Sequence, residues 1–191
     1  MEPYTPSELT EFLNSIERID WLAYFRTLAF TGARRGEILA LTRSDIDFKS
    51  KTIKISKTAT RTGISTPKTF NSNRIVTVDE KTLEILRNYM DTDLCGKQLL
   101  WCLPSGKFYD PDNVNSWLAK IFSLNPQLRK IRVHGFRHTH VSQLLALGVS
   151  PVDVAKRIGD RLSTVNNVYA HSIGKNSDKL SDLFSNQYRI Q

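Results

Sequence analysis

The stretch that decides the fold is HGFRHTHVSQLLALG, residues 134–148. On a helix, His134, Arg137 and His138 share one face, because residues three and four positions apart are neighbours on the helix surface. The apolar residues that follow recur at spacings that face a protein core, and they are Val141, Leu144 and Leu145. The pattern therefore predicts a helix that buries one side and presents a face rich in imidazole and guanidinium groups.

This face could hold a metal ion or an anion. His134 and His138 have the His-x-x-x-His spacing of zinc-binding helices. Arg137 lies between them on the same face and would repel a dication, and Gly135 stands where an H-E-x-x-H motif has its glutamate. A guanidinium fork and an imidazole donor suit a phosphate better. We expect an anion site, with no metal and no cofactor.

Composition limits the class of protein. The 191 residues, 40% of them hydrophobic and 24% charged, fit one globular domain with a sizeable core. No apolar run approaches the roughly 18 residues of a membrane span, and the first residues do not resemble a signal peptide. Cys95 and Cys102 are too few for a disulfide framework or a zinc site. These features predict a cytoplasmic protein without a membrane partner.

The net charge of +8 is unevenly distributed. Residues 49–74 hold seven basic side chains and no acid, and residues 113–152 hold five more, again without an acid. Two such stretches are typical of a surface that binds a polyanion, most often nucleic acid. A solvated charged face is the alternative interpretation.

The rest of the chain is predicted to be mainly helical around one small sheet. Thr5, Pro6 and Glu8 form a helix start with a capping box. Helical periodicity predicts helices near residues 5–16, 20–30, 34–41, 83–89, 114–121, 135–147, 150–159, 163–171 and 178–184. Within residues 46–78, the run 52–56 alternates and the run 74–78 is β-rich, and the Thr, Ser, Gly and Asn residues between them predict turns, so we expect a small antiparallel sheet.

Two further motifs could contribute to an anion site. In TGARRGEI, residues 31–38, a glycine turn precedes Arg34 at a helix start, where free backbone N–H groups favour an anion. Arg-x-x-Glu on a helix is equally often a structural ion pair. In RIGDRLSTVNNVYAHS, residues 157–172, Tyr169 follows Asp160 on a short predicted helix. A single tyrosine is usually a half-buried packing residue.

Taken together, these motifs resemble the catalytic domain of tyrosine recombinases, the phage integrase family, over essentially the whole chain. The family has a T-G-x-R-x-G-E box, a lysine in a β-hairpin, an H-x-x-R box, and a tyrosine nine residues after a histidine or tryptophan. The matching residues here are Arg34, Lys68, His134, Arg137 and Tyr169, with Asp160 in place of the usual histidine or tryptophan. The resemblance implies an α+β, mainly helical fold with a small three-stranded antiparallel sheet.

The resemblance also implies an activity. Tyr169 would cleave one DNA strand and form a 3′-phosphotyrosyl link, so that the strand is later rejoined without a metal or ATP. Arg34 and Arg137 would neutralise the charge that develops on the phosphate. His134 would assist the tyrosine, and Lys68 would protonate the departing 5′-oxygen, a contribution of about 10² to 10⁴-fold for general acid catalysis.

Several side chains are expected to support this site. Asp160 would face away from the phosphate and orient Arg161 or an active-site arginine by hydrogen bonding. Glu37 is expected to fix an arginine or lysine, His138 to brace the site through a hydrogen bond, and His140 to lie on the helix surface without a role. The basic residues Lys57, Arg61 and Arg74 are candidate phosphate contacts, which would make DNA binding depend on salt.

The resemblance carries expectations about the whole protein. Residues 1–191 would form a single catalytic domain of a longer bacterial or phage-encoded integrase whose upstream DNA-binding domains are missing. Residues 173–191, with a helix near 178–184, would dock on a neighbour. The partners would be a double-stranded recombination site and three further copies in a homotetramer, with a monomer in isolation. The alternatives are a catalytically impaired DNA-binding module, a type IB topoisomerase-like activity or a metal-dependent nuclease.

Overall fold

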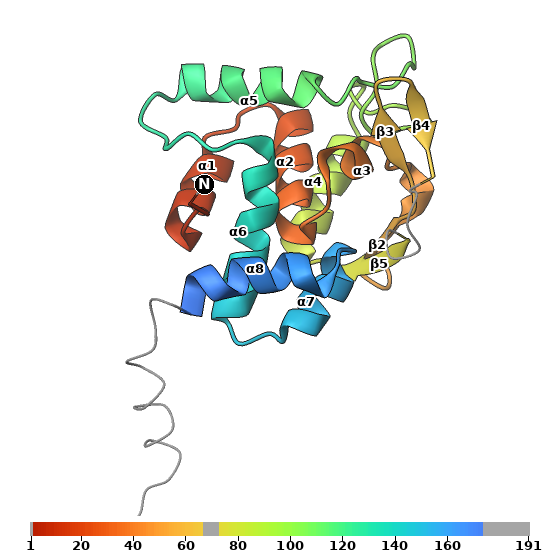
Figure 1. Ribbon diagram of the computed structural model, residues 1–191. Helices are drawn as coiled ribbons and strands as arrows, with labels where there is room; N and C mark the ends of the chain where they lie inside the picture. Colours follow the sequence, from red (N-terminus) through yellow and green to blue (C-terminus); the bar gives the residue numbers. More distant parts are fainter. Residues whose placement is uncertain (1, 67–72, 174–191) are drawn as a thin grey trace, which may run out of the picture.

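The computed structural model describes residues 2–66 and 73–173, with side chains described as far as Val168. Its helices are α1 (Pro6–Asn14), α2 (Ile19–Thr31), α3 (Arg35–Leu39), α4 (Glu80–Met90), α5 (Asn113–Leu124), α6 (Val133–Ala146), α7 (Pro151–Ile158) and α8 (Leu162–Ile173), with a 3-10 turn at Arg43–Asp45. Figure 1 shows α2 and α6 in the middle, α5 across one end, and α7 and α8 across the other. The predicted α+β, mainly helical fold is confirmed.

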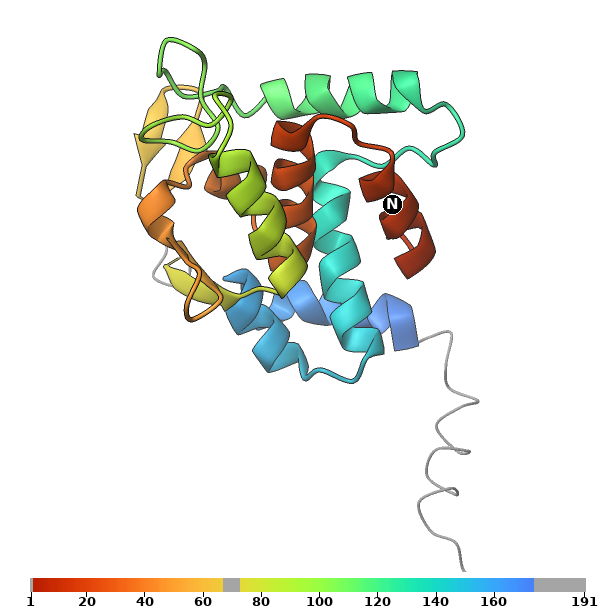
Figure 2. The same cartoon turned by 180° about the vertical axis from the view of Figure 1, so that it is seen from behind.

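The strands gather at one side of the helices, as Figure 2 shows from behind. They are β1 (Ile46–Asp47), β2 (Thr52–Ile55), β3 (Thr58–Thr60), β4 (Gly63–Ser65) and β5 (Arg74–Thr77). The predicted three-stranded antiparallel sheet has the order β1-β2-β5, with Ile53 opposite both Ile46 and Val76. A separate two-stranded hairpin, β3-β4, follows β2. This hairpin lies among the residues for which the sequence pattern predicted turns.

Local capping explains where the helices begin and end. Thr5 and Glu8 form the predicted capping box at the start of α1. The Ser150 hydroxyl accepts a hydrogen bond from the backbone N–H of Asp153 at the start of α7. Gly32 and Gly159 end α2 and α7 in the left-handed conformation, both with φ of 64°. Glycine adopts this conformation without the steric cost of a Cβ atom.

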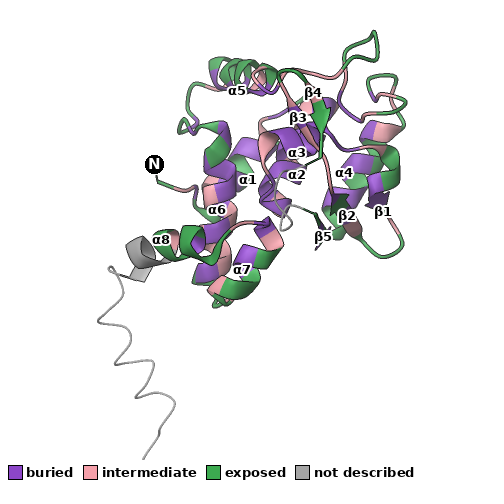
Figure 3. Ribbon diagram, turned by 45° about the vertical axis from the view of Figure 1, so that its right-hand side comes forward, coloured by how far each residue is buried: buried purple, intermediate pink, exposed green. Residues whose placement is uncertain are grey.

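Two clusters of buried side chains hold these elements together, and Figure 3 shows the buried faces turned inward. The larger one is centred on aromatic rings of α1, α2 and α6, with Phe12, Phe25 and Phe136 within 5.5 Å of one another by ring centroids. The smaller one joins α6, α7 and α8 through Val141, Ile158 and Val165. The smaller cluster therefore sets the position of α8, the helix that contains Tyr169.

No helix in the described part of the chain combines the length and the apolar character needed to cross a bilayer.

Candidate functional site

The turn after α2 determines the position of Arg34. A Cβ atom on Gly32 would lie 2.6 Å from Cδ2 of His140, so only glycine fits here. Arg34 is then the N-cap residue of α3, and its backbone N–H donates to Oε2 of Glu37 at 2.8 Å. Its Nη1 donates to Oε1 of the same carboxylate at 3.2 Å. The Arg34 side chain stays 41% exposed, so its guanidinium can reach a ligand.

Gly36, the second glycine of the TGARRGEI motif, is required for a different steric reason. A side chain on Gly36 would overlap the backbone carbonyl of Ala59 in β3. The close approach of α3 and β3 therefore seats the β3-β4 hairpin directly beside the helix that follows Arg34.

Arg137 is buried one turn into α6 and is held by main-chain carbonyls. Its Nη1 donates to the carbonyl oxygens of Gly32 at 2.7 Å and Ile158 at 2.9 Å. These carbonyls end α2 and α7, where they lack intrahelical partners and where the helix dipole favours a cation. Burial and the neighbouring Arg34 lower the pKa of Arg137 to about 10, which leaves it charged at neutral pH.

Asp160 lies between the two arginines. Its Oδ2 accepts from Nη2 of Arg34 at 2.9 Å and from Nη2 of Arg137 at 2.7 Å. Its Oδ1 accepts from the backbone N–H of Arg161 and from the hydroxyl of Thr164, in the first turn of α8. One carboxylate thus joins both arginines to the helix that carries Tyr169. Burial alone would raise the pKa of Asp160, but the hydrogen bonds from Arg161 and Arg137 outweigh it and lower the pKa.

Glu37 is the second carboxylate of the site, and it pairs with two arginines. It is buried, and besides Arg34 it accepts from Nη2 of Arg74 at 2.8 Å. Desolvation would raise the pKa of Glu37, but the hydrogen bond and the charge of Arg74 keep it below its usual value. Glu37 therefore occupies the structural ion-pair position that the Arg-x-x-Glu spacing indicated.

The placement of Arg74 corrects one prediction. Its side chain is only 6% exposed, because it reaches inward to Glu37 and donates through Nε to the carbonyl of Arg157 at 2.9 Å. A buried guanidinium in these bonds is not available as a surface contact for a DNA phosphate. Arg74 is the first residue of a β-rich run, and the sequence around it did not indicate that its side chain points inward.

His134 and His138 lie together at the start of α6. Their rings meet edge to face, with centroids 4.8 Å apart. Partial desolvation, His138 and the nearby arginines lower the pKa of His134 below its usual 6.5, so the ring is neutral at neutral pH. His138 therefore contacts the site through the ring of His134, whereas the sequence predicted a hydrogen bond that braces the site.

A basic pocket of about 340 Å³ opens where these residues meet. Its lining comes from the turn before α3, from α5 and from the start of α6, and consists of Ala33, Arg34, Arg35, Asn115, Arg132, Val133, His134 and Arg137. Four arginines and an imidazole on one concavity make a site for an anion such as a phosphodiester. The sequence motifs did not mark Arg35 or Arg132, although Arg35 adjoins Arg34 and Arg132 lies two residues before His134.

For two of the predicted catalytic residues, Tyr169 and Lys68, the structure does not describe the side chain. Tyr169 belongs to α8, so its backbone lies on the helix that Asp160 joins to the arginines. Lys68 lies outside the described residues.

The other candidate DNA contacts are paired with carboxylates. Nζ of Lys57 lies 2.7 Å from Oδ2 of the buried Asp45. Nη2 of Arg61, at the tip of the β3-β4 hairpin, lies 2.6 Å from Oδ2 of Asp112, whose other oxygen bonds Arg35. Arg61 remains 76% exposed and Lys57 30%, so Arg61 is the more accessible of the two.

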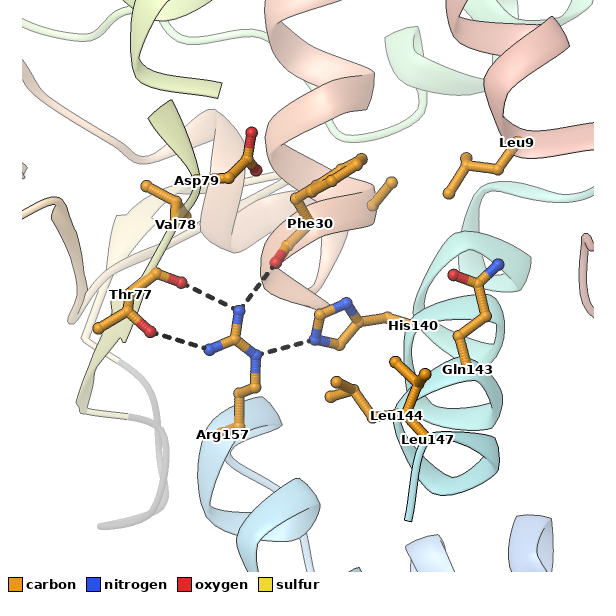
Figure 4. Close-up of a pocket in the computed structure, with 11 residues that line it drawn as sticks. Leu9, Phe30, Thr77, Val78, Asp79, His140, Gln143, Leu144, Leu147 and Arg157 are labelled. Carbon is orange, nitrogen blue, oxygen red and sulfur yellow. Dashed lines mark hydrogen bonds between the residues drawn. The ribbon is translucent and has the colours of Figure 1, made fainter. Parts of the chain in front are cut away.

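His140 was expected on the helix surface, and this expectation was wrong. Its ring packs against Gly32, and its Nε2 accepts from Nε of Arg157 at 3.0 Å, as Figure 4 shows. Burial and the charge of Arg157 lower the pKa of His140 to about 4. The periodicity of α6 did not reveal this contact because it depends on α7, a helix that follows later in the chain.

Across residues 2–66 and 73–168, no three side chains of the His, Cys, Asp and Glu types come close enough to hold a metal ion.

Comparisons with known proteins place the chain in a family. The Phage integrase family model matches residues 4–175. The ICEBs1 integrase of Bacillus subtilis is 31% identical over 96% of this chain and 55% of its own length. The integrase of Staphylococcus phage L54a is 30% identical over 75% of this chain and 45% of its own length. The chain therefore spans about half the length of these relatives.

Solved structures show the same fold. The Tn1549 transposon integrase in complex with transposon right end DNA has a TM-score of 0.78 and 19% identity, over 94% of this chain and 66% of that one. The XerA recombinase has a TM-score of 0.75 and 20% identity, over 100% of this chain and 64% of that one. Since the family model covers most of the sequence, the chain belongs to the phage integrase family.

Proposed function

We propose that the chain is the catalytic domain of a tyrosine-type site-specific DNA recombinase. It would cleave one strand of a recombination site through a 3′-phosphotyrosyl intermediate and rejoin it to a partner. The observation that carries the proposal is the convergence of Arg34 and Arg137 on one carboxylate that also holds α8, beside a basic pocket. Membership of a family whose related proteins are named integrases and recombinases supports it and does not favour the impaired or topoisomerase-like alternatives.

The arginine pair supplies the charge stabilisation that the reaction needs. Attack of the Tyr169 hydroxyl on phosphorus breaks the bond to the 5′-oxygen and increases the negative charge on the nonbridging oxygens. Guanidinium groups already fixed by Gly32, Ile158 and Glu37 require little reorganisation to neutralise that charge. Such preorganised donors are worth about 10² to 10³-fold each in comparable sites.

Proton transfer is assigned to two other groups. His134 lines the basic pocket and has a lowered pKa, so at neutral pH its imidazole can accept a proton during attack by Tyr169. Lys68 would give a proton to the departing 5′-oxygen, as the family resemblance implies. No cofactor is required, because the phosphotyrosyl bond conserves the energy of the phosphodiester.

Asp160 is proposed to orient the arginines. In the absence of DNA its carboxylate neutralises the repulsion between Arg34 and Arg137 and keeps both forks in place. Its second oxygen keeps the first turn of α8 in register with them. A phosphate would then bind to the outward N–H groups of Arg34, which is the more exposed of the two arginines.

The partners and context follow from the same proposal. The domain would bind double-stranded DNA at a recombination site, with Arg61 and Lys57 near the backbone. Recombination would take place in a homotetramer, and the isolated domain would be monomeric. The parent protein would be a bacterial or phage-encoded cytoplasmic integrase with upstream DNA-binding domains and a C-terminal docking tail at 173–191. Both relatives extend well beyond the part that this chain matches, which supports a longer parent protein.

The test is capture of a covalent protein–DNA adduct on a nicked suicide substrate. We expect an SDS-resistant adduct that persists in EDTA and is lost in Tyr169→Phe. Tyr109→Phe is the matched control, because Tyr109 is partly exposed and makes a ring contact with Trp117 outside the pocket. An adduct that survives Tyr169→Phe, or that requires a divalent metal, would contradict the proposal.

A further inference from the structure

Arg157, on the last turn of α7, is partly buried and reaches toward Phe30, Thr77 and His140 (Figure 4). Its Nη2 donates to the carbonyls of Phe30 and Thr77, both at 3.0 Å, and its Nη1 lies 3.4 Å from the Thr77 hydroxyl. Its Nε donates to Nε2 of His140 at 3.0 Å. One guanidinium thus joins α2, β5, α6 and α7.

The partners of this cation are neutral. Within the described residues, no carboxylate lies within ion-pair distance of Arg157. The carbonyl of Phe30 lies in the last turn of α2, where the helix dipole is negative and carbonyls need external donors. Arg157 therefore acts as a C-terminal cap for α2, and it loses hydration without gaining an anionic partner.

His140 completes the arrangement. Because its Nε2 accepts from Arg157, the neutral ring carries its proton on Nδ1, and a hydrogen bond joins the ring to the backbone of Ala29. The same ring presses on Gly32, the residue that turns the chain from α2 into Arg34. The carbonyl of Gly32 in turn accepts from Arg137. Both site arginines thus depend on a turn that His140 and Arg157 hold from behind.

We infer that Arg157, acting through His140, is a positioning residue that fixes the Gly32 turn and thereby sets the geometry of Arg34 and Arg137 at the phosphate. The inference rests on the proposed function and adds to it a residue that touches neither DNA nor the reacting atoms. Displacement of a catalytic group by about 1 Å can cost about 10²-fold in rate. Loss of Arg157 is expected to approach that figure.

The decisive experiment compares two nicked suicide substrates, one with a normal scissile phosphate and one with a neutral methylphosphonate at that position. The methylphosphonate has no negatively charged nonbridging oxygen, so it depends less on well-placed arginines. For Arg157→Met, we expect cleavage of the phosphate to fall up to about 10²-fold. On the methylphosphonate, we expect a loss at least about tenfold smaller. Lys156→Met, an exposed charge on the same helix, should leave the ratio of the two rates unchanged.

Arg34→Ala and Arg137→Ala calibrate the comparison. If neither variant distinguishes the two substrates, the charge role of the arginines in the proposed function is wrong. If both distinguish them while Arg157→Met loses rate equally on both, the positioning inference is overturned and Arg157 is a general stabilising residue.

A second pair of variants keeps the test valid if Arg157→Met unfolds. His140→Gln retains a side-chain acceptor for the Nε of Arg157, whereas His140→Phe removes it. With both variants confirmed as folded by thermal denaturation, we expect His140→Gln to retain the wild-type substrate ratio and His140→Phe to shift toward the methylphosphonate. Equal ratios in the two variants would contradict a role for the Arg157–His140 hydrogen bond.

Discussion

Replacing Asp160 by asparagine isolates the charge that lies between the two site arginines. Asparagine keeps the size of the side chain and one oxygen acceptor, but removes the negative charge shared by Arg34 and Arg137. In the absence of DNA the two guanidinium groups would then repel each other without compensation. We therefore expect a less stable protein whose arginines are less well ordered before substrate binds.

The exposure of each pair sets the size of the effect. The Asp160–Arg34 pair, 20% and 41% exposed, is screened by solvent and contributes about 0 to 1 kcal/mol. The Asp160–Arg137 pair involves a guanidinium that is 5% exposed, and a hydrogen bond to such a charged group contributes about 1.5 to 3 kcal/mol. The Asp160–Arg137 pair therefore contributes most of the expected loss of stability. Thermal unfolding of Asp160→Asn should therefore shift down by roughly 3 to 12 °C, at about 2 to 4 °C per kcal/mol for a domain of this size.

Asp112→Asn is the matched control, because Asp112 also bridges two arginines, Arg35 and Arg61, but is 42% exposed. Its loss should cost at most about 1 kcal/mol. Denaturation and the rate of adduct formation on suicide DNA would be measured for both variants and for Asp160→His. If Asp160 orients the arginines, neither substitution at 160 accelerates cleavage. An Asp160→His chain that cleaves more than about tenfold faster would show that the carboxylate mainly repels the phosphate, and the reasoning would fail.

Three further predictions concern Glu37, His134 and Arg61. Glu37→Gln removes the carboxylate that pairs with the buried Arg74 and should cost about 3 to 5 kcal/mol in urea denaturation at pH 7. Because the pKa of Glu37 is lowered in the folded chain, its contribution is present above the ordinary value of 4.5 and is lost as pH falls through the folded value, so the variant should show a weaker loss of stability toward acid. If neutral His134 accepts a proton, the rate of adduct formation should fall as pH drops through its lowered pKa, below 6.5, and His134→Gln should remove that acid limb; an unchanged limb would assign it to another group. Arg61→Gln should reduce the salt slope of DNA binding by about one, while Lys81→Gln, which loses only a pair with Glu84, should not change it.

Among the described residues, the helices match those predicted from the sequence because their ends depend on local chemistry, and the helix predicted near 178–184 lies outside the described residues. The hydroxyls of Thr5 and Ser150 and the left-handed glycines at 32 and 159 act within a few residues of their own positions. The pairing of β2 with β5 joins segments that are far apart along the chain, because the β3-β4 hairpin lies between them in the sequence. Alternation of side chains predicts a strand, but it does not predict which strand lies beside it.

The difference between local and long-range contacts also explains which site residues the sequence predicted correctly. His134 and Arg137 were predicted together because they are one helical turn apart on α6. The predicted surface positions of Arg74 and His140 were wrong, since each side chain binds a partner from a distant segment, Glu37 for the first and Arg157 for the second. A charged or imidazole side chain has no apolar periodicity that would reveal its inward orientation.

The carboxylate of Asp160 lowers the free energy of the site before DNA binds, because it lies between two arginines that repel each other. Arg34 and Arg137 lie close enough that the first lowers the pKa of the second, so the pair is unfavourable unless an anion lies between them. Here the carboxylate is present before DNA arrives, so the arginines are ordered in advance and less conformational freedom is lost on binding. The same carboxylate weakens the attraction of the pocket for phosphate. We therefore expect this chain to bind DNA less tightly than its Asp160→Asn variant, while holding its catalytic groups in a more fixed geometry.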